Sequence, residues 1–381
     1  MLAGPAHAHT KQAVLAYLES LCPDPGAVHL LLNSRAGEAL AGLLVPRTAH
    51  SAAAAGVSEE VRCAAAGLLG LLIRHASAVS EGLVAAGLLD SLAAGVEPCA
   101  PPELQRRCAA TLGELLFYVA SQQRAGGQPG GGAWAVEGHH LAALLGLLGP
   151  GRDEVAQHYA AKASENICGL GGVWPARLAT PDMQAALLAI VQRDGAGEGL
   201  RATAASALQR LLRCAPHLLE ALLDETQGGL ARLTVWLTDA NPRVRQAGTT
   251  CLCQLLASDT HVAALVGRRE GAGQADALTE LTSALAALMD SQGARVGGLL
   301  PPLLLRYCLA PLMWLLSSSH GRSGRAAGQG AGGGRAAGPW RLAGPGCSGR
   351  QPPAGAAGPL RAGGRGRRRG RGHRAARLSR C

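Results

Sequence analysis

One carboxylate inside an apolar helical run is the first residue whose type could do chemistry. The run is RRCAATLGELLFYVASQ, residues 106–122, and it holds Glu114 beside Phe117, the only phenylalanine of the chain. A carboxylate in such a place could be the acid of an active site. It could equally be a surface residue on a helix that packs through its other sides. The elements that position Glu114 decide between these two interpretations.

Other arrangements that carry chemistry do not occur in the sequence. There is no GxSxG, HExxH or GxxxxGK[ST] motif, and no set of kinase motifs. The adjacent pair His139-His140 should place its rings on different sides of a helix, which is poor geometry for one metal ion. The eleven cysteines are scattered singly and are interpreted as free thiols. We therefore expect no enzyme, no cofactor and no metal site.

The basic charge of the chain is concentrated at its end. The 381 residues carry a net charge of +10, but residues 320–381 alone hold 14 arginines and no acidic residue. The remaining residues hold 22 of the 36 basic and all 26 acidic side chains, a net charge of −4. Nucleic-acid binding would therefore depend on the tail. Such a tail is also what translation of GC-rich DNA in a wrong reading frame produces, so a gene-model artefact is an alternative.

Apolar residues recur with one spacing in five segments. In four segments they occupy offsets 0, 8, 11 and 12, which fall on one broad helical face at ~100° per residue. The copy that starts at Val155 is looser, because Asn166 stands at offset 11. The segments begin at Val61, Leu104, Val155, Leu200 and Val244, which are 43, 51, 45 and 44 residues apart. A helical repeat of this length predicts an all-α, armadillo/HEAT-type solenoid.

Glu114 lies at offset 10 of its copy, away from the apolar face. We therefore interpret it as a solvated or inter-repeat residue and not as a catalytic acid. Residues opposite the apolar face are candidates for contact with a protein partner, and plain solvated surface is the alternative for each. These candidates are Glu114, Gln122, Glu165, Arg210 and Gln254.

The last copy, TDANPRVRQAGTTCLCQLL, resembles the second helix of a HEAT repeat and the turn before it. Asp239, Pro242, Val244 and Arg245 occupy the positions that mark that repeat. Proline suits a helix start because its missing N–H would have no partner there. In HEAT repeats the matching Asp and Arg bond between adjacent repeats. Two other copies have the arginine but a glycine in place of the aspartate, so we expect an incomplete ladder.

The chain divides into three expected parts. Residues 1–56 should form irregular N-terminal helices or a capping repeat, with helices around residues 13–21 and 27–44. Residues 57–319 should form the repeat array, with a flexible loop at 124–133 and final helices at 277–289 and 296–316. Residues 320–381, rich in Gly, Ala and Arg, should be disordered. Prolines and an arginine interrupt the longest apolar stretch, residues 297–316, so no membrane span is expected.

Two stretches go beyond a generic helical repeat. LQRRCAATLGELLFYVASQ (104–122) and VAQHYAAKASENICGL (155–170) resemble segments of the helical-repeat region of the Fused/Unc-51-like kinase 4 group, called RUNKEL in plants. RVGGLLPPLLLRYC (295–308) resembles a later segment of the same array. Members of that group carry a kinase or pseudokinase domain before a long armadillo/HEAT array. This chain lacks the kinase motifs, so the resemblance carries over the array and not phosphotransfer.

The resemblance implies a non-catalytic scaffold that binds proteins. In that group the array is similar to scaffolds on microtubule structures, so the expected partners are tubulin or ciliary components and the expected location is the cytoplasm, cytoskeleton or cilium. One alternative is an armadillo cargo adapter for basic peptides, which would need a Trp/Asn ladder. Trp134, Trp174, Trp236 and Trp314 have no asparagine four residues later. The other alternative is an RNA-binding protein that acts through the arginine tail.

Overall fold

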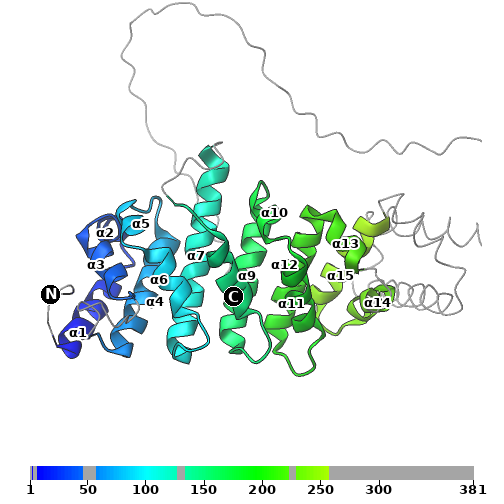
Figure 1. Ribbon diagram of the computed structural model, residues 1–381, viewed down its shortest axis with the longest axis horizontal. Helices are drawn as coiled ribbons and strands as arrows, with labels where there is room; N and C mark the ends of the chain where they lie inside the picture. Colours follow the sequence, from blue (N-terminus) through cyan, green and yellow to red (C-terminus); the bar gives the residue numbers. More distant parts are fainter. Residues whose placement is uncertain (1, 3–6, 46–56, 127–133, 223–228, 257–381) are drawn as a thin grey trace, which may run out of the picture. The chain divides into compact units, whose positions relative to one another are not determined.

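The structure is a computed structural model that describes residues 2, 7–45, 57–126, 134–222 and 229–256. These residues form helices and no strand, which confirms the predicted all-α class (Figure 1). They belong to one compact unit, residues 1–326. The tail, the segment 295–308 and the two final expected helices lie outside the described residues, and so does the boundary expected at residue 320.

The described residues contain helices of very different length. They are α1 (Ala8–Ser20), α2 (Pro25–Leu32), α3 (Arg35–Gly42), α4 (Glu59–His75), α5 (Gly82–Ala85), α6 (Leu88–Gly95), α7 (Pro102–Gly126), α8 (Gly138–Leu147), α9 (Glu154–Leu170), α10 (Trp174–Leu178), α11 (Pro181–Gln192), α12 (Glu198–Cys214), α13 (Pro216–Leu222), α14 (Gly229–Thr238) and α15 (Pro242–Leu256).

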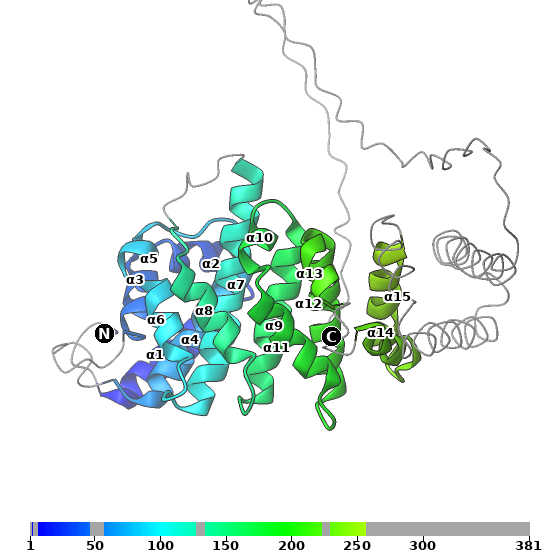
Figure 2. The ribbon, with the colours of Figure 1, turned by 45° about the vertical axis from the view of Figure 1, so that its right-hand side comes forward.

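The five repeated segments are the five long helices α4, α7, α9, α12 and α15. Each packs against the next one, and α1 packs against α4 at the other end of the row (Figures 1 and 2). Between consecutive long helices the chain forms one or two shorter helices. The predicted period therefore corresponds to one structural unit of the stack.

Four of the five described units contain three helices: α2–α3–α4, α5–α6–α7, α10–α11–α12 and α13–α14–α15. The unit α8–α9 contains two within the described residues. Three helices per unit are typical of armadillo repeats, whereas HEAT repeats have two. The array is therefore closer to the armadillo type, although α15 carries the residues typical of a HEAT helix.

Two boundaries differ from the sequence prediction. The helix expected over residues 27–44 is divided into α2 and α3. Ser34 Oγ accepts a hydrogen bond from the Ala36 amide 3.2 Å away, and this N-cap starts a new helix. The loop expected from Arg124 begins later, because α7 continues to Gly126.

The register of α9 differs by one residue from the predicted one. Asp153 caps this helix by accepting a hydrogen bond from the Ala156 amide at 3.0 Å. Ala156 is therefore the third residue of α9 and is fully buried, whereas Val155 is 44% exposed. In the other four long helices the buried residue at offset 0 is also the third residue. We therefore count positions from this residue in every long helix, and call Ala156 position 0 of α9.

Successive long helices are in close contact near position +9 where this position is glycine. A Cβ atom on Gly70 of α4 would lie 2.7 Å from Oγ1 of Thr111 on α7. A Cβ atom on Gly113 of α7 would lie 3.0 Å from Cβ of Ala163 on α9. Glycine at these two positions therefore permits the close stacking of α4, α7 and α9.

Candidate partner-binding groove

A groove of about 620 Å³ runs over α1, α4, α7 and the start of α9. Its lining includes the small residues Ala64, Gly67 and Ala110 of α4 and α7, of which Ala64 is exposed and the other two are half-buried. Because these side chains are small, they cover little of the backbones of the two helices. A partner can therefore approach these backbones from outside. Val155 and Tyr159 of α9 line the far end and are 44% and 36% exposed.

Charged side chains of both signs form the rim of the groove. Arg74 of α4 donates from Nε to Oε1 of Glu114 on α7 at 2.9 Å. Arg107 is paired with Glu103 one turn earlier on α7, with Nε 2.9 Å from Oε1. Three arginines and three glutamates line the groove, and all except Glu19 form ion pairs within the described residues, so the groove has no strong charge of either sign.

Glu114 is a structural residue of this rim. Its side chain is part-buried and bonded to Arg74, and its hydrogen-bond partners among the described residues include no histidine, cysteine or second carboxylate. The ion pair links two successive units of the stack. The interpretation of Glu114 as an inter-repeat residue therefore agrees with its place in the structure.

Glu165 does not lie on the exposed side, contrary to the sequence prediction. The shift of register in α9 places it at position +9, where α9 meets α12, and its side chain is only 3% exposed. Its carboxylate accepts hydrogen bonds from Lys162 at 2.7 Å and from Ser206 at 2.8 Å, and lies 3.2 Å from Nη2 of Arg210. Burial alone raises the pKa of the Glu165 carboxyl, but these hydrogen bonds and positive charges outweigh it, so the pKa lies below its ordinary value.

The other three candidates have different environments. Arg210 crosses from α12 to α9, where its Nη1 donates to the Glu165 carbonyl at 3.0 Å. Gln254 is part-buried on α15, and its Oε1 has no hydrogen-bond partner among the described residues. Gln122 is exposed near the end of α7. The five candidates therefore do not form one exposed strip, and their role in partner contact stays a prediction.

The residue at position +1 of every long helix holds the end of the preceding helix. In each unit a side-chain N–H group donates to a main-chain carbonyl at or just beyond that end. The bonds are Arg62 to Leu44 (3.3 Å), Gln105 to Ala100 (2.7 Å), Gln157 to Gly149 (2.8 Å), Arg201 to Val191 (3.1 Å) and Arg245 to Asp239 (2.7 Å). Glutamine thus replaces arginine in two units. The sequence analysis considered only arginine at this position and so missed both glutamines, and the register of α9, one residue off, placed Gln157 at another position as well.

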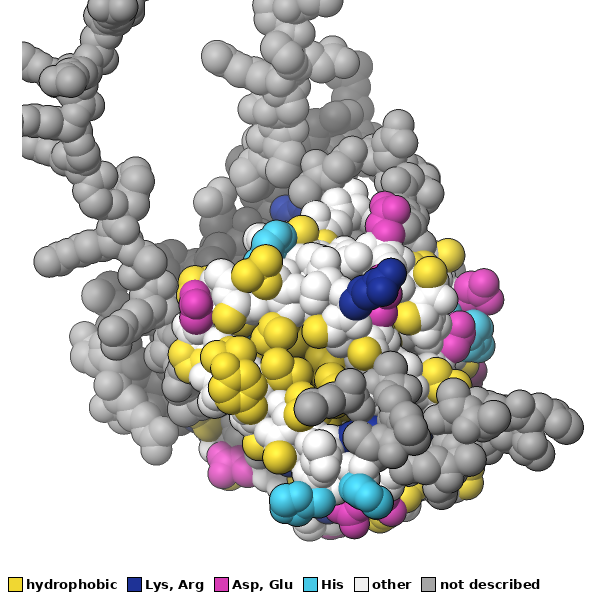
Figure 3. All heavy atoms as spheres, turned by 90° about the vertical axis from the view of Figure 1, so that its left-hand side faces the viewer, with side chains coloured by type: hydrophobic (Ala, Val, Ile, Leu, Met, Phe, Trp, Pro, Cys, Tyr) yellow, Lys and Arg dark blue, Asp and Glu magenta, His cyan; other side chains and the backbone are white. Residues whose placement is uncertain are grey.

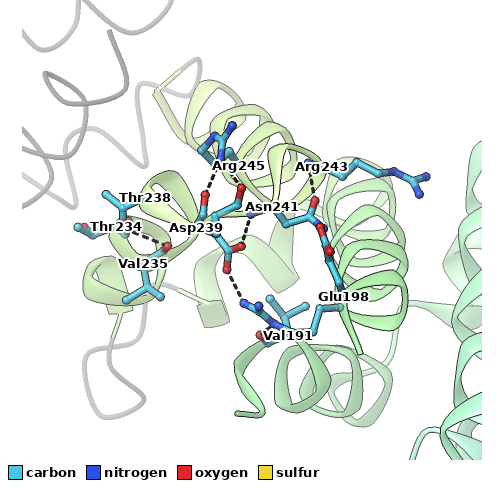
Figure 4. A network of polar contacts seen from close by, with 11 residues as sticks. Val191, Glu198, Thr234, Val235, Thr238, Asp239, Asn241, Arg243 and Arg245 are labelled. Carbon is cyan, nitrogen blue, oxygen red and sulfur yellow. Dashed lines mark hydrogen bonds and ion pairs between the residues drawn. The ribbon is translucent and has the colours of Figure 1, made fainter. Parts of the chain in front are cut away.

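Contacts between units lie close to these bonds (Figure 4). Asp239 forms an ion pair with Arg201 of the preceding unit, as the HEAT-like pattern predicted. Asn241 donates to Oε1 of Glu198 at 2.9 Å, which adds a second bond between α12 and the turn before α15. Pro242 is the first residue of α15 and Val244 is fully buried. The four HEAT-like residues therefore organise the junction between the last two described units.

A different pair makes the junction between α7 and α9. Arg106 donates to both carboxylate oxygens of Asp153, at 2.9 and 2.7 Å. Hydrogen bonding to the Arg106 guanidinium holds the pKa of the Asp153 carboxyl below its ordinary value, although burial acts in the opposite direction. Because Asp153 also caps α9, this pair fixes the start of α9 on the side of α7.

The pair His139-His140 does not point to two sides of a helix, contrary to the sequence prediction. The ring centroids are 3.8 Å apart, and Nε2 of each ring lies within 3.0 Å of the same oxygen of Asp90 on α6. The rings lie in the first turn of α8, where both can reach across to α6. The geometric reason for expecting no metal ion at this pair is therefore wrong.

Apolar side chains also gather on the face at the α1 end of the row (Figure 3). Tyr17 on α1 and Leu30 on α2, two helices at this end, are 64% and 71% exposed.

Within the described ranges, no helix has the length and apolar character that crossing a membrane requires.

No family model matches the sequence. The protein is similar to serine/threonine-protein kinase RUNKEL of Arabidopsis thaliana, with 31% identity over 225 residues that cover 56% of this chain and 16% of RUNKEL. It is similar to serine/threonine-protein kinase ULK4 of Mus musculus, with 26% identity over 212 residues that cover 55% of this chain and 16% of ULK4. A designed armadillo repeat protein, YIII(Dq)4CqI, aligns with 66% of this chain and 95% of its own, at 18% identity and a TM-score of 0.49.

The similarities to RUNKEL and ULK4 confirm the resemblance predicted from residues 104–122 and 155–170. The match spans 16% of the length of each kinase, so it assigns none of the activities of the whole kinases to this chain. The described residues form a helical-repeat array that is related in sequence to RUNKEL and ULK4.

Proposed function

We propose that this chain is a non-catalytic scaffold that binds a protein partner in the groove on α1, α4, α7 and α9. The observation that carries the proposal is the groove itself, which has a volume of about 620 Å³ and includes small alanine and glycine residues in its lining. A stack of helical units offers an extended surface to which a macromolecule can bind over several units. The exposed Val155 and Tyr159 provide apolar contact area at the α9 end.

The rim indicates what kind of segment the groove would hold. Its charges are paired, so a strongly acidic or strongly basic segment gains little there. A partner segment with an apolar residue for the Val155–Tyr159 end and both signs of charge along its length matches the groove better. Charges of both signs on the segment can pair with both members of a rim ion pair. Neither member is then left without water and without an opposite charge.

Selection of peptides by the full-length chain tests this proposal. Peptides from a display library should bind the wild-type chain and lose binding when Ala110→Glu places a charged side chain in the groove. Ala142→Glu is the matched control, because Ala142 is exposed on α8 outside the groove. Equal binding to the wild type and to both variants would show that the groove is not the site.

We further propose that the scaffold acts on microtubules or in cilia, in the cytoplasm. The support is the resemblance to the Fused/RUNKEL group. Residues 1–319 carry a net charge of −4, so attraction to the acidic surface of tubulin would have to come from the groove, from a partner or from the arginine tail.

Co-sedimentation of the full chain with purified microtubules tests this part. Raised salt screens the charge of the tail, so that the contribution of the array can be measured. We expect the wild type and Ala142→Glu to pellet at raised salt, and Ala110→Glu to pellet less. Pelleting of the wild type no better than a neutral control protein would contradict direct binding.

A further inference from the structure

Three side chains on two helices converge on one point outside the groove. Asp90 is the third residue of α6, and His139 and His140 are the second and third residues of α8, which packs against α6. Nε2 of His139 lies 2.9 Å and Nε2 of His140 lies 3.0 Å from Oδ1 of Asp90. One potential ligand atom from each residue lies within 4.8 Å of the other two.

The start of α8 determines this arrangement. Glu137 is the N-cap of α8, and its amide donates to Nδ1 of His140 at 2.9 Å in a capping box. This bond turns the opposite nitrogen, Nε2, toward α6. The His140 side chain is 4% exposed and therefore fixed, whereas His139 and Asp90 are 53% and 69% exposed and open to water. The cluster thus has one anchored ring and two side chains that can adjust.

We propose that Asp90, His139 and His140 form a binding site for a divalent transition-metal ion such as zinc. Two imidazoles and one carboxylate are a ligand set that zinc accepts, with remaining positions filled by water. Ligands of a tetrahedral zinc site are about 3.3 Å apart, as zinc–ligand distances of about 2.0–2.1 Å require. The two oxygen–nitrogen distances are slightly shorter than this, and the exposed Asp90 can move outward to admit the ion. The bound ion would clamp α6 to α8 and so join two neighbouring units.

Proton positions follow from the bonds on the other side of each ring. The ion needs both Nε2 atoms free of protons. His139 can keep its proton on Nδ1, which lies 3.4 Å from Oε2 of Glu137, an arrangement common for metal-bound histidine. In the structure the Glu137 amide donates to Nδ1 of His140, so the neutral ring carries its proton on Nε2. Binding of the ion needs the other tautomer, so this hydrogen bond is lost, and the burial of the His140 side chain, which is 4% exposed, then holds the ring in place.

Calorimetric titration of the chelator-treated, full-length chain with zinc at about pH 7.5 tests the site. Cysteine thiolates in general also bind zinc, so the comparison between variants decides the result. Wild-type protein should bind one equivalent more than Asp90→Ala and His139→Gln, both of which change exposed residues. His217→Gln is the matched control, because His217 is exposed on α13 and outside the cluster.

Thermal unfolding supplies a second readout. Zinc should raise the Tm of the wild type and of His217→Gln by several degrees, and raise it less in Asp90→Ala and His139→Gln, because an ion that binds only the folded state stabilises it. Full zinc binding by either cluster variant would overturn the proposal. The absence of a difference between His139→Gln and His217→Gln in both measurements would overturn it as well.

Discussion

Removal of the Glu165 carboxylate should weaken the contact between α9 and α12. The side chain is 3% exposed and accepts hydrogen bonds from Lys162 and Ser206. In Glu165→Ala these donors and Arg210 lose their common acceptor. A hydrogen bond to a charged group contributes about 1.5–3 kcal/mol. Lys162 and Arg210 are 46% and 34% exposed and can turn to water, so we expect a total loss of about 2 kcal/mol of unfolding free energy.

Urea unfolding of the full-length chain, followed by circular dichroism, measures this loss. Glu165→Gln keeps the volume and one acceptor oxygen, so it should lose about 1 kcal/mol. Glu114→Ala is the matched control, because Glu114 is also an inter-helix carboxylate but its partner Arg74 is 54% exposed. It should lose at most about 1 kcal/mol. A loss in Glu165→Ala no larger than that in Glu114→Ala would refute the register of α9.

The pH dependence of stability supplies a second test of Glu165. Its pKa is lower in the folded chain than the ordinary value of 4.5. The stabilisation is therefore present above the unfolded pKa and disappears as the pH falls through the folded pKa. Between about pH 5 and about pH 3 the wild type should lose more unfolding free energy than Glu165→Gln. Parallel curves for the two proteins would contradict this sign.

Other predictions concern packing, junctions and thiols. Gly70→Ala should lower the unfolding free energy by about 1–3 kcal/mol, because the new Cβ overlaps a side chain of α7. Gly42→Ala is the control, because Gly42 has open space around it, and this variant should be neutral or slightly stabilising in the same urea assay. Arg201→Ala should lower the unfolding free energy by about 2 kcal/mol, because it leaves the carboxylate of Asp239 buried without its partner. Amide hydrogen exchange in α15 should become faster, and unchanged exchange would contradict the role of this ion pair at the junction. Burial raises the pKa of Cys251 to about 12, so iodoacetamide should label the exposed Cys99 in the native chain and Cys251 only after unfolding, as peptide mass spectrometry would show.

The long helices could be predicted from the sequence because they share one buried pattern. Within the described residues, α4, α7, α9 and α12 each pack against a helix of the row on both sides, so leucine and valine recur at equal spacing. The short helices α5, α10 and α13 could not be predicted in this way. They have four, five and seven residues, which is fewer than two helical turns and too short for a periodic apolar pattern.

The register of α9 was wrong for a physical reason. An apolar pattern favours valine over alanine as the buried residue, so Val155 was chosen over Ala156. The aspartate cap at the start of α9 decides the matter, because it fixes which residue is third in the helix. With Ala156 at position 0, Glu165 moves from the exposed side to the contact with α12. An N-cap search before α9 could have found this shift.

The remaining differences depend on contacts between units. Whether His139 and His140 meet depends on Asp90, which lies about 50 residues earlier in the chain. The groove depends on the close approach of α4 to α7 at Gly70 and of α7 to α9 at Gly113. Neither distance follows from the pattern within a single helix.

The central claim is that the groove lined by α4 and α7 is the binding surface. Site-specific photo-crosslinking tests this claim most directly. A photo-reactive amino acid at position 110 lies in the groove, and the same amino acid at position 142 lies on α8 outside it. With a peptide selected by the wild-type chain, we expect a crosslink from position 110 and none from position 142. A crosslink from position 142 alone, or equal crosslinks from both positions, would contradict the proposed site.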